Sequence, residues 1–501
     1  MVWVVENLTL VLVLSVPALW YLSYLWKRRK LYIYSWNIPG PFALPFIGAA
    51  YKFIGSPEYI LEKLIKLVER YPSPMSIWLG PRLFFCLTDP HHAEKILTSQ
   101  KCLGKDHFYK FMIYNIGTGL LTAPVPKWKK HRKLIMPSFH QKILDSFVDI
   151  FTEQATVFTD ILRAYAGRKN IDISKPVSAM MLDIICETAM GLKMNTQREG
   201  NVFATHLDQM MLIATIRVFA VWHHLDWTWR LYPLSRKLDK HLAGIHEVTS
   251  KIIRKKLEVF EKQKENRRDS LVAELDEGGK KRRVFLDLIL ENSEFTEEEI
   301  REEVNIFLGA GTDTSSTTLC FLLEMLGLYP EIQQKVYEEV IDVLGEERSV
   351  EASDLPRFMY LERVIKETLR LFPVGAFVVR SIGEDINLGT CTLPKGSSAL
   401  ISSLNIHRDP KYWPEPLKFD PDRFLPEEIA KRHPCCYIPF SYGPRNCIGN
   451  RYAMMSLKTI AATTVRKYRM FTGYKSVEDI EMMVKVIVKP TKGYKVYLEQ
   501  R

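Results

Sequence analysis

Hydrophobic residues along this chain recur mostly every three or four positions, which is the spacing of an amphipathic helix. The stretch 331–344 shows this pattern clearly, with Pro330 at its start and Gly345 after its end. Strand-like segments are short: 75–79, 83–87, 377–380 and 484–488. The pattern therefore predicts a mainly α (α+β) fold, with one large helical domain and small β-sheets.

One helix is predicted to be unusually long and well capped. Thr296 is a suitable N-cap, Glu299 completes a capping box with it, and the helical pattern runs to about Leu328. Gly309 and Gly311 lie in the middle of this helix, where each costs up to ~1 kcal/mol relative to alanine. We therefore expect a close backbone approach or a local bulge at that point.

The N-terminal region contains one uncharged apolar stretch, residues 8–26. Its length matches the ~30 Å hydrocarbon core of a bilayer at about 1.5 Å per helical residue. The basic run Lys-Arg-Arg-Lys at 27–30 follows it, which favours a lumenal N-terminus and a cytosolic body. A cleaved signal peptide fits less well, because its basic residues would precede the apolar stretch. We expect a single-pass anchor in the endoplasmic reticulum membrane.

Charge and cysteine usage narrow the class of protein further. The 69 Lys+Arg exceed the 58 Asp+Glu, for a net charge of +11, which suits nucleic acid, an anionic membrane or an acidic partner. The sequence has no zinc-finger spacing, RNP-like motif or basic leucine heptad, so we expect no nucleic acid. The eight cysteines include no C-x-x-C pair, and a cytosolic body predicts free thiols.

The strongest chemical signal is the decapeptide 440–449, Phe-Ser-Tyr-Gly-Pro-Arg-Asn-Cys-Ile-Gly. Cys447 precedes a predicted helix over 448–468, whose positive end favours a thiolate. Gly443 and Gly449 would let a flat macrocycle lie against the backbone, and Arg445 offers a guanidinium to a carboxylate of that macrocycle. A lone cysteine would be better explained as a packing residue, but this whole pattern predicts a thiolate–iron site.

The decapeptide resembles the F-x-x-G-x-R-x-C-x-G haem-binding signature of the cytochromes P-450, the haem-thiolate monooxygenases. The resemblance implies the cytochrome P-450 fold and haem b, with Cys447 as the metal ligand. Four further motifs of the family precede the decapeptide, in the order in which the family has them. Since distant motifs then serve one cofactor, we divide the chain into a membrane anchor and basic stop (1–30), a proline-rich hinge (31–50) and one catalytic domain (51–501).

The resemblance implies several contacts to the haem propionates. Trp128 and Arg132 match the family's W-x-x-x-R motif and share a helix face, and Arg380 matches the arginine at the end of a short strand. With Arg445 and Cys447, they make up the predicted cofactor-binding set. A solvated basic helix would explain the lysines around Trp128 but not the tryptophan itself. The prolines at 124 and 126 depart from the family's usual glycine turn. The resemblance therefore does not predict how the chain enters this helix.

Residues 310–315, Ala-Gly-Thr-Asp-Thr-Ser, match the family's oxygen-activation segment. The resemblance implies catalytic roles for Asp313 and Thr314, which would relay protons to dioxygen. Two other matches, Glu367-x-x-Arg370 and Pro-Asp-Arg-Phe at 421–424, imply a buried ionic network behind the thiolate. We expect this network to stabilise the core behind the thiolate.

The implied reaction inserts one oxygen atom of dioxygen into a lipophilic substrate, using electrons from NADPH. The sequence contains no flavin or nicotinamide motif, so a separate NADPH–cytochrome P-450 reductase is expected, with cytochrome b5 as a further partner. A basic face for this acidic partner is predicted from five lysines: Lys127, Lys129, Lys130, Lys133 and Lys458.

The motifs look most like those of the microsomal family-four-like group, which includes fatty-acid ω-hydroxylases and insect enzymes. Fatty acids, terpenoid hormones and xenobiotics all stay open as substrates. Many ω-hydroxylases of that group carry a glutamate that forms an ester to haem, and Ala310 occupies its position here. Alanine has no nucleophilic oxygen, so the haem is predicted to be non-covalent apart from the Cys447 bond.

Two other functions stay open at this point. One is a haem-thiolate isomerase or dehydratase that does not use dioxygen, although such enzymes usually lack the acid–alcohol pair that Asp313 and Thr314 form here. The other is a non-catalytic membrane haem-binding protein. The aromatic segment 222–232 likewise has two readings, core packing and contact with the bilayer interface.

Overall fold

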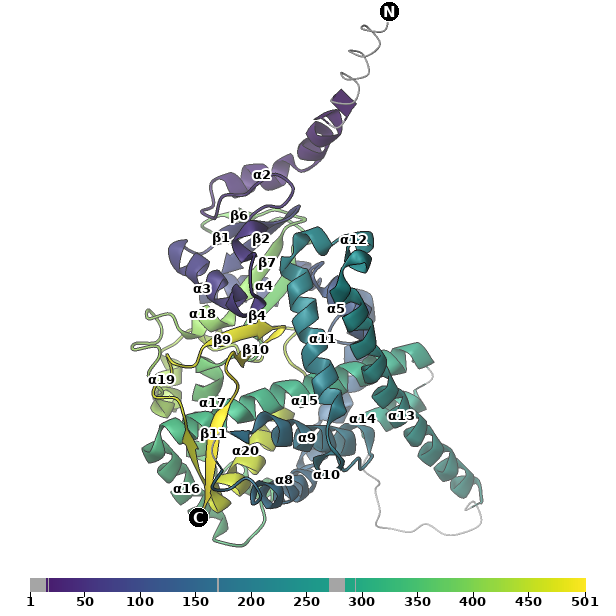
Figure 1. The fold of residues 1–501 in the computed structure, drawn as a ribbon, viewed down its shortest axis with the longest axis vertical. Helices are drawn as coiled ribbons and strands as arrows, with labels where there is room; N and C mark the ends of the chain where they lie inside the picture. The colour runs from purple at the N-terminus through teal and green to yellow at the C-terminus, as the bar shows by residue number, and fades with distance from the viewer. Residues whose placement is uncertain (1–14, 17, 169–170, 270–283, 293) are drawn as a thin grey trace, which may run out of the picture.

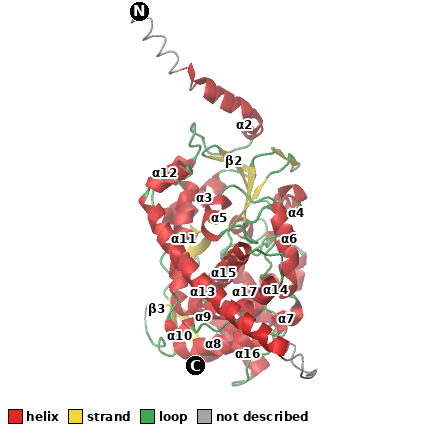
Figure 2. Cartoon of the chain, turned by 90° about the vertical axis from the view of Figure 1, so that its right-hand side faces the viewer, coloured by secondary structure: helices red, strands yellow, loops and turns green. Residues whose placement is uncertain are grey.

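The computed structural model describes residues 15–16, 18–168, 171–269, 284–292 and 294–501. Helices make up most of the body, and short strands lie beside them (Figures 1 and 2). The predicted mainly helical fold with small sheets is confirmed. Within the predicted membrane segment, positions 8–14 and 17 lie outside the described residues, and residues 18–27 are helical.

The long central helix is α15 (Glu297–Leu328), with the ends that the sequence predicted. Its capping box is formed: the Glu299 N–H donates to the Thr296 hydroxyl at 3.2 Å, and the Glu299 carboxylate accepts from the Thr296 N–H at 3.1 Å. The helix packs against α9 (Ser174–Ile185), α11 (Val202–Phe219), α13 (Pro233–Asp269), α17 (Met359–Leu371) and α20 (Asn450–Lys467). It crosses the middle of the molecule in Figure 1.

The two central glycines of α15 differ in what they allow. A Cβ built on Gly311 would lie 2.6 Å from the Ile185 Cδ1 of α9, which is too close for two carbon atoms. A Cβ on Gly309 would make an ordinary contact of 3.5 Å with Leu207. The helix is continuous without a bulge, so close approach is confirmed at Gly311 alone.

The main sheet has four strands in the order β1 (Met75–Leu79), β2 (Arg82–Leu87), β7 (Ser398–Ser402), β4 (Phe377–Ser381). β2 and β7 pair in parallel, and the other two pairs are antiparallel. Three of the four predicted strands are confirmed here within one residue at each end. A three-stranded sheet contains β3 (Ile171–Asp172), β11 (Lys495–Gln500) and β8 (Tyr468–Thr472), and a two-stranded one contains β5 (Ile386–Asn387) and β6 (Thr392–Leu393).

The fourth predicted strand, 484–488, is wrong. The chain reverses at Val486, whose φ is +64°, and forms a hairpin of β9 (Met482–Lys485) and β10 (Ile487–Pro490). Alternating apolar residues on both arms gave one continuous pattern in the sequence. The Val488 N–H donates to the Val374 carbonyl at 3.0 Å, which ties the hairpin to the loop before β4.

The segment after the N-terminal helix packs against the main sheet. Ile38 is buried, the Ser76 N–H donates to the Pro39 carbonyl at 2.8 Å, and Gly48 forms a bridge with Leu79 of β1. The prolines therefore direct the chain onto the body. Further helices of the body are α2 (Arg29–Trp36), α3 (Ile60–Arg70), α4 (Pro90–Thr98), α5 (Tyr109–Ile116), α6 (Val125–Ile135), α7 (Gln141–Asp145), α8 (Val148–Leu162), α10 (Thr196–Glu199), α12 (Asp226–Leu231), α14 (Phe285–Glu291), α16 (Pro330–Leu344), α18 (Ser403–His407) and α19 (Pro426–Ala430).

Candidate haem-binding site

Cys447 ends the loop that leads into α20. Its N–H donates to the Phe440 carbonyl at 2.9 Å, which closes the loop of the decapeptide. The predicted helix start at 448 is wrong, because Ile448 and Gly449 form a turn and α20 begins at Asn450. Cys447 therefore lies two residues before the helix cap at Gly449 rather than in the first turn.

Cys447 differs from every other cysteine of the chain in its surroundings. It is exposed, whereas six of the other seven are buried and Cys391 is half-buried. Its sulfur is therefore accessible to a ligand, unlike the sulfurs of the packing cysteines. Burial raises the pKa of the Cys447 thiol above its ordinary value, although the Gly449 N–H and Arg132 oppose this rise. The protein alone thus favours the thiol, and a bound metal ion is what converts such a group to a thiolate.

Gly443 is required for a reason other than the one the sequence suggested. Its φ is +72°, and a Cβ there would lie 2.2 Å from the Leu97 carbonyl oxygen at the end of α4. The glycine therefore allows the cysteine loop to pack closely against α4, which is not the same as making room for a macrocycle. Gly449 fits the original reading better, since a Cβ there would approach nothing closer than the Cys447 sulfur at 3.9 Å.

Helix α6 brings Trp128 and Arg132 beside the cysteine loop. The prolines at 124 and 126 do not disturb it, because one lies at the N-cap and the other in the first turn. Arg132 donates to the carbonyl and to the side-chain oxygen of Asn446 at 2.7 and 2.6 Å. Trp128 is buried, with the Arg445 guanidinium over its ring at 4.4 Å.

Arg445 and Arg380 are buried with few partners. The Arg445 Nη2 donates to the Ala123 carbonyl at 2.9 Å, but its Nε and Nη1 have no partner. Arg380, on β4, donates only to its neighbour's carbonyl at 3.2 Å in the part of the chain that the structure describes. Burial and the charge of Arg380 lower the pKa of Arg445 to about 10.

Lys105 is a third cation at this place, and the sequence analysis missed it. Its backbone bridges to Arg380, and burial together with Arg380 and Arg445 lowers the pKa of Lys105 well below its ordinary value. No ion pair joins any of the three to a carboxylate among the described residues. We call Lys105, Arg380 and Arg445 the cationic cluster. Arg380 and Arg445 are buried, whereas Lys105 is half-buried with its Nζ 4.5 Å from the centre of the Tyr109 ring. Like charges this close are unfavourable until an anion binds between them.

Two side chains of the oxygen-activation segment are accessible to solvent. Ala310 is exposed and Thr314 is half-buried, although most of the central residues of α15 are buried. The Thr314 hydroxyl donates to the Ala310 carbonyl at 2.7 Å, as such residues commonly do within helices. These two residues share a face at i and i+4.

Asp313 points to a different neighbour from the one expected. Its Oδ1 accepts from the Lys489 Nζ of β10 at 2.8 Å, and its Oδ2 is buried without a partner. No hydrogen bond joins Asp313 to Thr314 among the described residues. Burial raises the pKa of the Asp313 carboxyl, and Lys489 opposes this only in part.

These residues fit a haem group. A flat dianionic macrocycle needs cations for its two carboxylates and an accessible thiol for its iron. The cationic cluster and Cys447 provide these two features. Ala310 has no side-chain oxygen that could form an ester to the haem.

The predicted ionic network behind the cysteine loop is formed. Arg370 pairs with Glu367 through two bonds of 2.7 and 2.8 Å, and both side chains are completely buried. Arg370 also donates to the carbonyls of His407, Pro416 and Lys418. Arg423 lies 3.5 Å from Glu367. The network thus joins α17 to the segment before η9 (Pro421–Phe424).

Fewer than five of the lysines predicted to form the basic face are available to a partner. Lys127 pairs with Glu302 at 2.8 Å and with Glu299 at 3.4 Å, because α15 brings these acids to α6. Lys130 pairs with Glu294 at 3.2 Å. Lys129 and Lys133 are exposed and form no ion pair within the described ranges. These two lysines are what remains of the basic face on α6.

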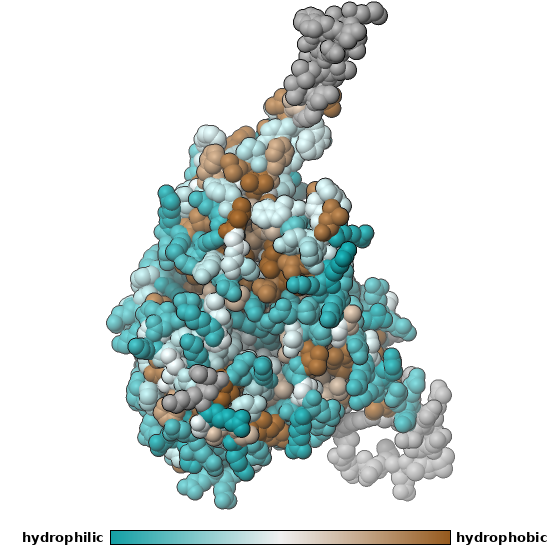
Figure 3. Space-filling model, viewed as in Figure 1, coloured by the Kyte–Doolittle hydropathy of each residue, from teal (hydrophilic) through white to brown (hydrophobic). Residues whose placement is uncertain are grey.

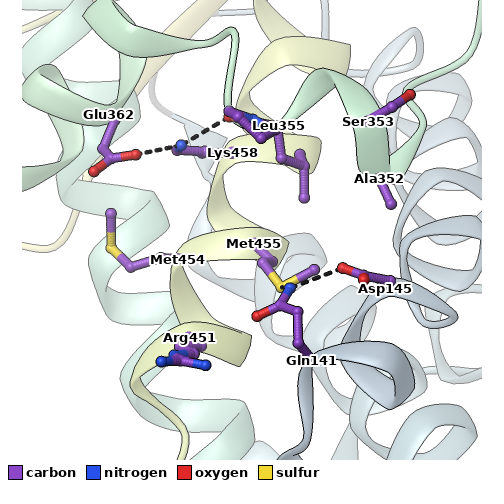
Figure 4. A pocket seen from close by; sticks show the side chains of 11 residues that line it. Gln141, Asp145, Ala352, Ser353, Leu355, Glu362, Arg451, Met454, Met455 and Lys458 are labelled. Carbon is purple, nitrogen blue, oxygen red and sulfur yellow. Dashed lines mark hydrogen bonds and ion pairs between the residues drawn. The ribbon is translucent and has the colours of Figure 1, made fainter.

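Lys458 lines a cavity of about 550 Å³ beside α20 rather than an open basic surface (Figure 4). It is buried, donates to the Leu355 carbonyl at 2.9 Å and pairs with Glu362. None of the predicted haem-binding residues lines this cavity. Exposed Arg451 lies at its rim and was not predicted.

Comparison with known proteins covers almost the whole chain. The profile of the family described as cytochrome P450 matches residues 38–498. Cytochrome P450 4c3 of Drosophila melanogaster is 34% identical over 491 residues, which cover 95% of this chain and 91% of that protein. Cytochrome P450 4c21 of Blattella germanica is 37% identical over 477 residues, 93% of each chain. Cytochrome P450 4V2 of Homo sapiens is 34% identical over 491 residues, 95% of this chain and 93% of that protein. The profile match and these relatives show that the chain belongs to the cytochrome P450 family.

Proposed function

We propose that, in this haem-thiolate monooxygenase, the thiolate of Cys447 binds the iron of haem b. The haem propionates are held by the cationic cluster together with Trp128 and Arg132, and protons are delivered by Asp313 and Thr314. The bound haem supplies activation of dioxygen, of which one atom enters the substrate and the other leaves as water. The protein's own part is to orient the haem, exclude water and move protons.

One observation carries this proposal. The single exposed cysteine lies in a loop that Arg132 of α6 holds in place. Arg445 of the same loop is buried, two of its guanidinium nitrogens have no partner, and it forms no ion pair with an acid among the described residues. A haem satisfies both at once, since it brings a metal for the thiol and carboxylates for the cations. A structural cysteine would be buried, as the other seven are wholly or partly.

The proton path rests on Thr314 and Asp313. The Thr314 hydroxyl is half-buried beside exposed Ala310, and its oxygen keeps free lone pairs while it donates to the Ala310 carbonyl. The free Oδ2 of Asp313 can take up a proton. Because the two groups do not touch, a proton passes between them through a water molecule or a side-chain rotation.

The two alternative functions are not favoured. An isomerase or dehydratase would not need the acid–alcohol pair, and a scaffold would need neither that pair nor an accessible thiol. The family match extends over the entire helical body.

The central test is the spectrum of the reduced protein with carbon monoxide. Cys447→Ser should abolish the thiolate-type Soret band, whereas Cys436→Ser, in a buried cysteine, should keep it. Retention of the band in Cys447→Ser would overturn the ligand assignment. Turnover with NADPH, a reductase and a panel of fatty acids, terpenoids and plant toxins then identifies the substrate class.

Members of this family take electrons from a redox partner and act on lipophilic substrates. We propose an NADPH–cytochrome P450 reductase, assisted by cytochrome b5, which docks on Lys129, Lys133 and Arg451. These three cations are exposed on α6 and α20, the helices that flank the cysteine loop. Reversing the charge of Lys129 and Lys133 together should raise the KM for reductase and leave the haem spectrum unchanged. An unchanged KM would contradict this surface.

We also propose that one end of the molecule faces the endoplasmic reticulum membrane. Helices α2 and α12 lie at the end that carries the N-terminus in both views (Figures 1 and 2). Apolar side chains are exposed there, including Trp36 at 86%, Trp227 at 66% and Leu231 at 78%. The hydropathy surface shows brown patches at the same end (Figure 3). Trp229 is buried, so the aromatic segment divides between the core and this surface.

Deletion of residues 1–30 tests the anchor. The shortened protein should keep its haem spectrum and leave the microsomal pellet in large part. Any residual binding should disappear when Trp227 and Leu231 are also replaced by serine. Helix α11 also has the length and composition of a membrane span, but 44% of it is buried and it packs on α13 and α15, which are core contacts. Undiminished binding after both changes would contradict this orientation.

A further inference from the structure

Lys489 lies between two carboxylates that come from different helices. Its Nζ is 2.8 Å from the Asp313 Oδ1 of α15 and 3.0 Å from the Asp208 Oδ1 of α11. The lysine itself belongs to β10. Only 16% of its side chain is exposed, so both ion pairs are largely shielded from solvent.

A second lysine makes the two carboxylates unequal. Lys485 of β9 lies 3.0 Å from Asp208 and forms no ion pair with Asp313 among the described residues. Burial tends to raise the pKa of Asp208, but Lys489 and Lys485 together hold it below its ordinary value. Burial and the nearby charge of Asp208 raise the pKa of Asp313, and Lys489 with the more distant Lys485 opposes this only in part. Tyr494, which follows the hairpin, and Cys320 of α15 are further titratable groups near Asp313.

The free oxygen of Asp313 shows what this arrangement leaves available. Oδ1 is fixed by Lys489, while Oδ2 is buried and has no partner. A buried carboxylate with one bound and one free oxygen has a fixed orientation and an open position for a proton.

The hairpin is also fastened to α11 at a second point. The Val486 N–H at its turn donates to the Thr215 hydroxyl at 2.8 Å. Asp208 and Thr215 therefore hold the two arms and the turn against α11, while Lys489 reaches from the same hairpin to α15. The position of α11 and the orientation of Asp313 thus depend on the same lysine.

We propose that Lys489 is a positioning residue for Asp313, held in place by Asp208, and that it lets Asp313 release the proton it takes up. This inference rests on the proposed relay role of Asp313. Burial alone would keep the Asp313 carboxyl protonated, and a group that never loses its proton cannot deliver one repeatedly. The Lys489 charge lowers the proton affinity of Asp313 enough for it to cycle. Lys489 touches neither substrate nor cofactor in this role.

The decisive experiment follows the Asp313 carboxyl by infrared titration. Holoenzyme labelled with carbon-13 aspartate is titrated without substrate, and subtraction of the Asp313→Asn spectrum isolates the band of interest. Lys489→Met, which keeps the length of the side chain and removes its charge, should shift the midpoint to higher pH. Lys489→Arg should return it toward the original position. Lys492→Met is the matched control, because Lys492 pairs with Glu481 on the exposed turn after β10 and should cause no shift. An unchanged midpoint in Lys489→Met overturns the proposal.

Coupling gives the second measurement. At pH 7, Lys489→Met should lower the ratio of product to NADPH consumed about tenfold, less than the ~10²–10⁴ that a positioned acid can contribute. Coupling should recover as the pH rises, because the raised pKa of Asp313 is then exceeded. Asp208→Asn should have a smaller effect, since Lys489 keeps its bond to Asp313.

The two proposals fail in different ways. If Asp313→Asn stays fully coupled, the relay assignment is wrong, and the infrared midpoints still report whether Lys489 sets the proton affinity of Asp313. If Asp313→Asn is uncoupled while Lys489→Met is coupled at every pH, the relay stands and the positioning role of Lys489 is wrong. A haem spectrum like that of the unmodified protein shows that each variant is folded.

Discussion

Two of the buried charge networks among the described residues differ in how completely their carboxylates are hydrogen-bonded. In the Glu367–Arg370 network, both carboxylate oxygens accept hydrogen bonds and Arg370 reaches three backbone carbonyls. In the Asp313–Lys489 network, one carboxylate oxygen has no partner and the far end at Asp208 is 27% exposed. The first network joins α17 to the chain near η9, and the second joins α15 to α11.

This difference separates a structural role from a chemical one. A buried carboxylate whose two oxygens are both bonded, as in Glu367, has no free oxygen to exchange a proton, and any rearrangement breaks several bonds at once. A network with a free oxygen and a partly solvated end can change protonation at small cost. Burial of charge alone therefore does not indicate function, whereas an incomplete network next to a reactive segment does.

Arg370→Ala should produce the largest effect, because it breaks the complete network. Glu367 would be left buried without its main partner, at a cost of about 3–5 kcal/mol. We expect little haem-containing protein and a strongly lowered unfolding temperature, measured by the reduced carbon monoxide spectrum and thermal denaturation. Arg363→Ala on the same helix is the control, since its pair with Asp422 is partly exposed and should be worth at most ~1 kcal/mol. Normal haem content in Arg370→Ala would contradict the structural role of the Glu367–Arg370 network.

Ala310 lies on α15, one turn before Asp313 of the second network, and has no side-chain oxygen. The haem should therefore carry no ester to the protein. Acid–organic extraction of the unmodified protein should remove all of the haem, with the mass of iron protoporphyrin IX. Ala310→Glu supplies the missing carboxylate and should retain part of the haem on the denatured chain after turnover. Haem that stays with the unmodified chain would contradict the prediction.

Thr314→Ala should uncouple the reaction without disturbing either network. Haem content and the carbon monoxide spectrum should be normal, while NADPH consumption yields about tenfold less product and more hydrogen peroxide. Thr318→Ala, one turn further along α15, removes a hydroxyl that bonds to the Thr314 carbonyl and should stay coupled. Equal coupling in the two variants would exclude the relay role of Thr314.

Asp208→Asn should give the smallest effect on stability, seen as a change in the pH dependence of stability. The lysines hold the folded pKa of Asp208 below its ordinary value, so this carboxylate stabilises the fold above about pH 4. The contribution, roughly 1 kcal/mol, is lost as the pH falls through the lowered pKa. Thermal unfolding of the two proteins should therefore differ at pH 7 and converge in acid. A constant difference at all pH values would mean that the charge of Asp208 is not the cause.

Features that are set by residues close together in the sequence, such as helix ends, could be predicted. The ends of α15 follow from Thr296, Glu299 and the apolar pattern, and the structure places them as predicted. The start of α20 was predicted two residues early, because nothing local distinguishes a turn at Ile448 from a first helical turn. The single strand predicted at 484–488 failed for a similar reason, since a tight reversal at Val486 needs no glycine to occur.

Contacts between distant segments could not be predicted from one sequence. Neither Lys105 nor Lys489 belongs to a motif in the sequence, and only the fold brings them to Arg380 and Asp313. Conversely, Lys127 looked free for a partner, yet its acids lie on α15, about 170 residues later. Charge patterns within one helix therefore indicate which residues are basic but not which of them stay available.

The close packing of Gly311 on Ile185 has a consequence for how relatives of this chain can diverge. A side chain larger than hydrogen at 311 is compatible with the fold only when position 185 becomes smaller. The two positions are 126 residues apart in the numbering of the chain and should nevertheless vary as a pair. The Cγ1 of Ile185 would also lie too close, at 2.8 Å, so a lineage that acquires alanine at 311 should carry alanine at 185. The smaller residue at 185 should appear first.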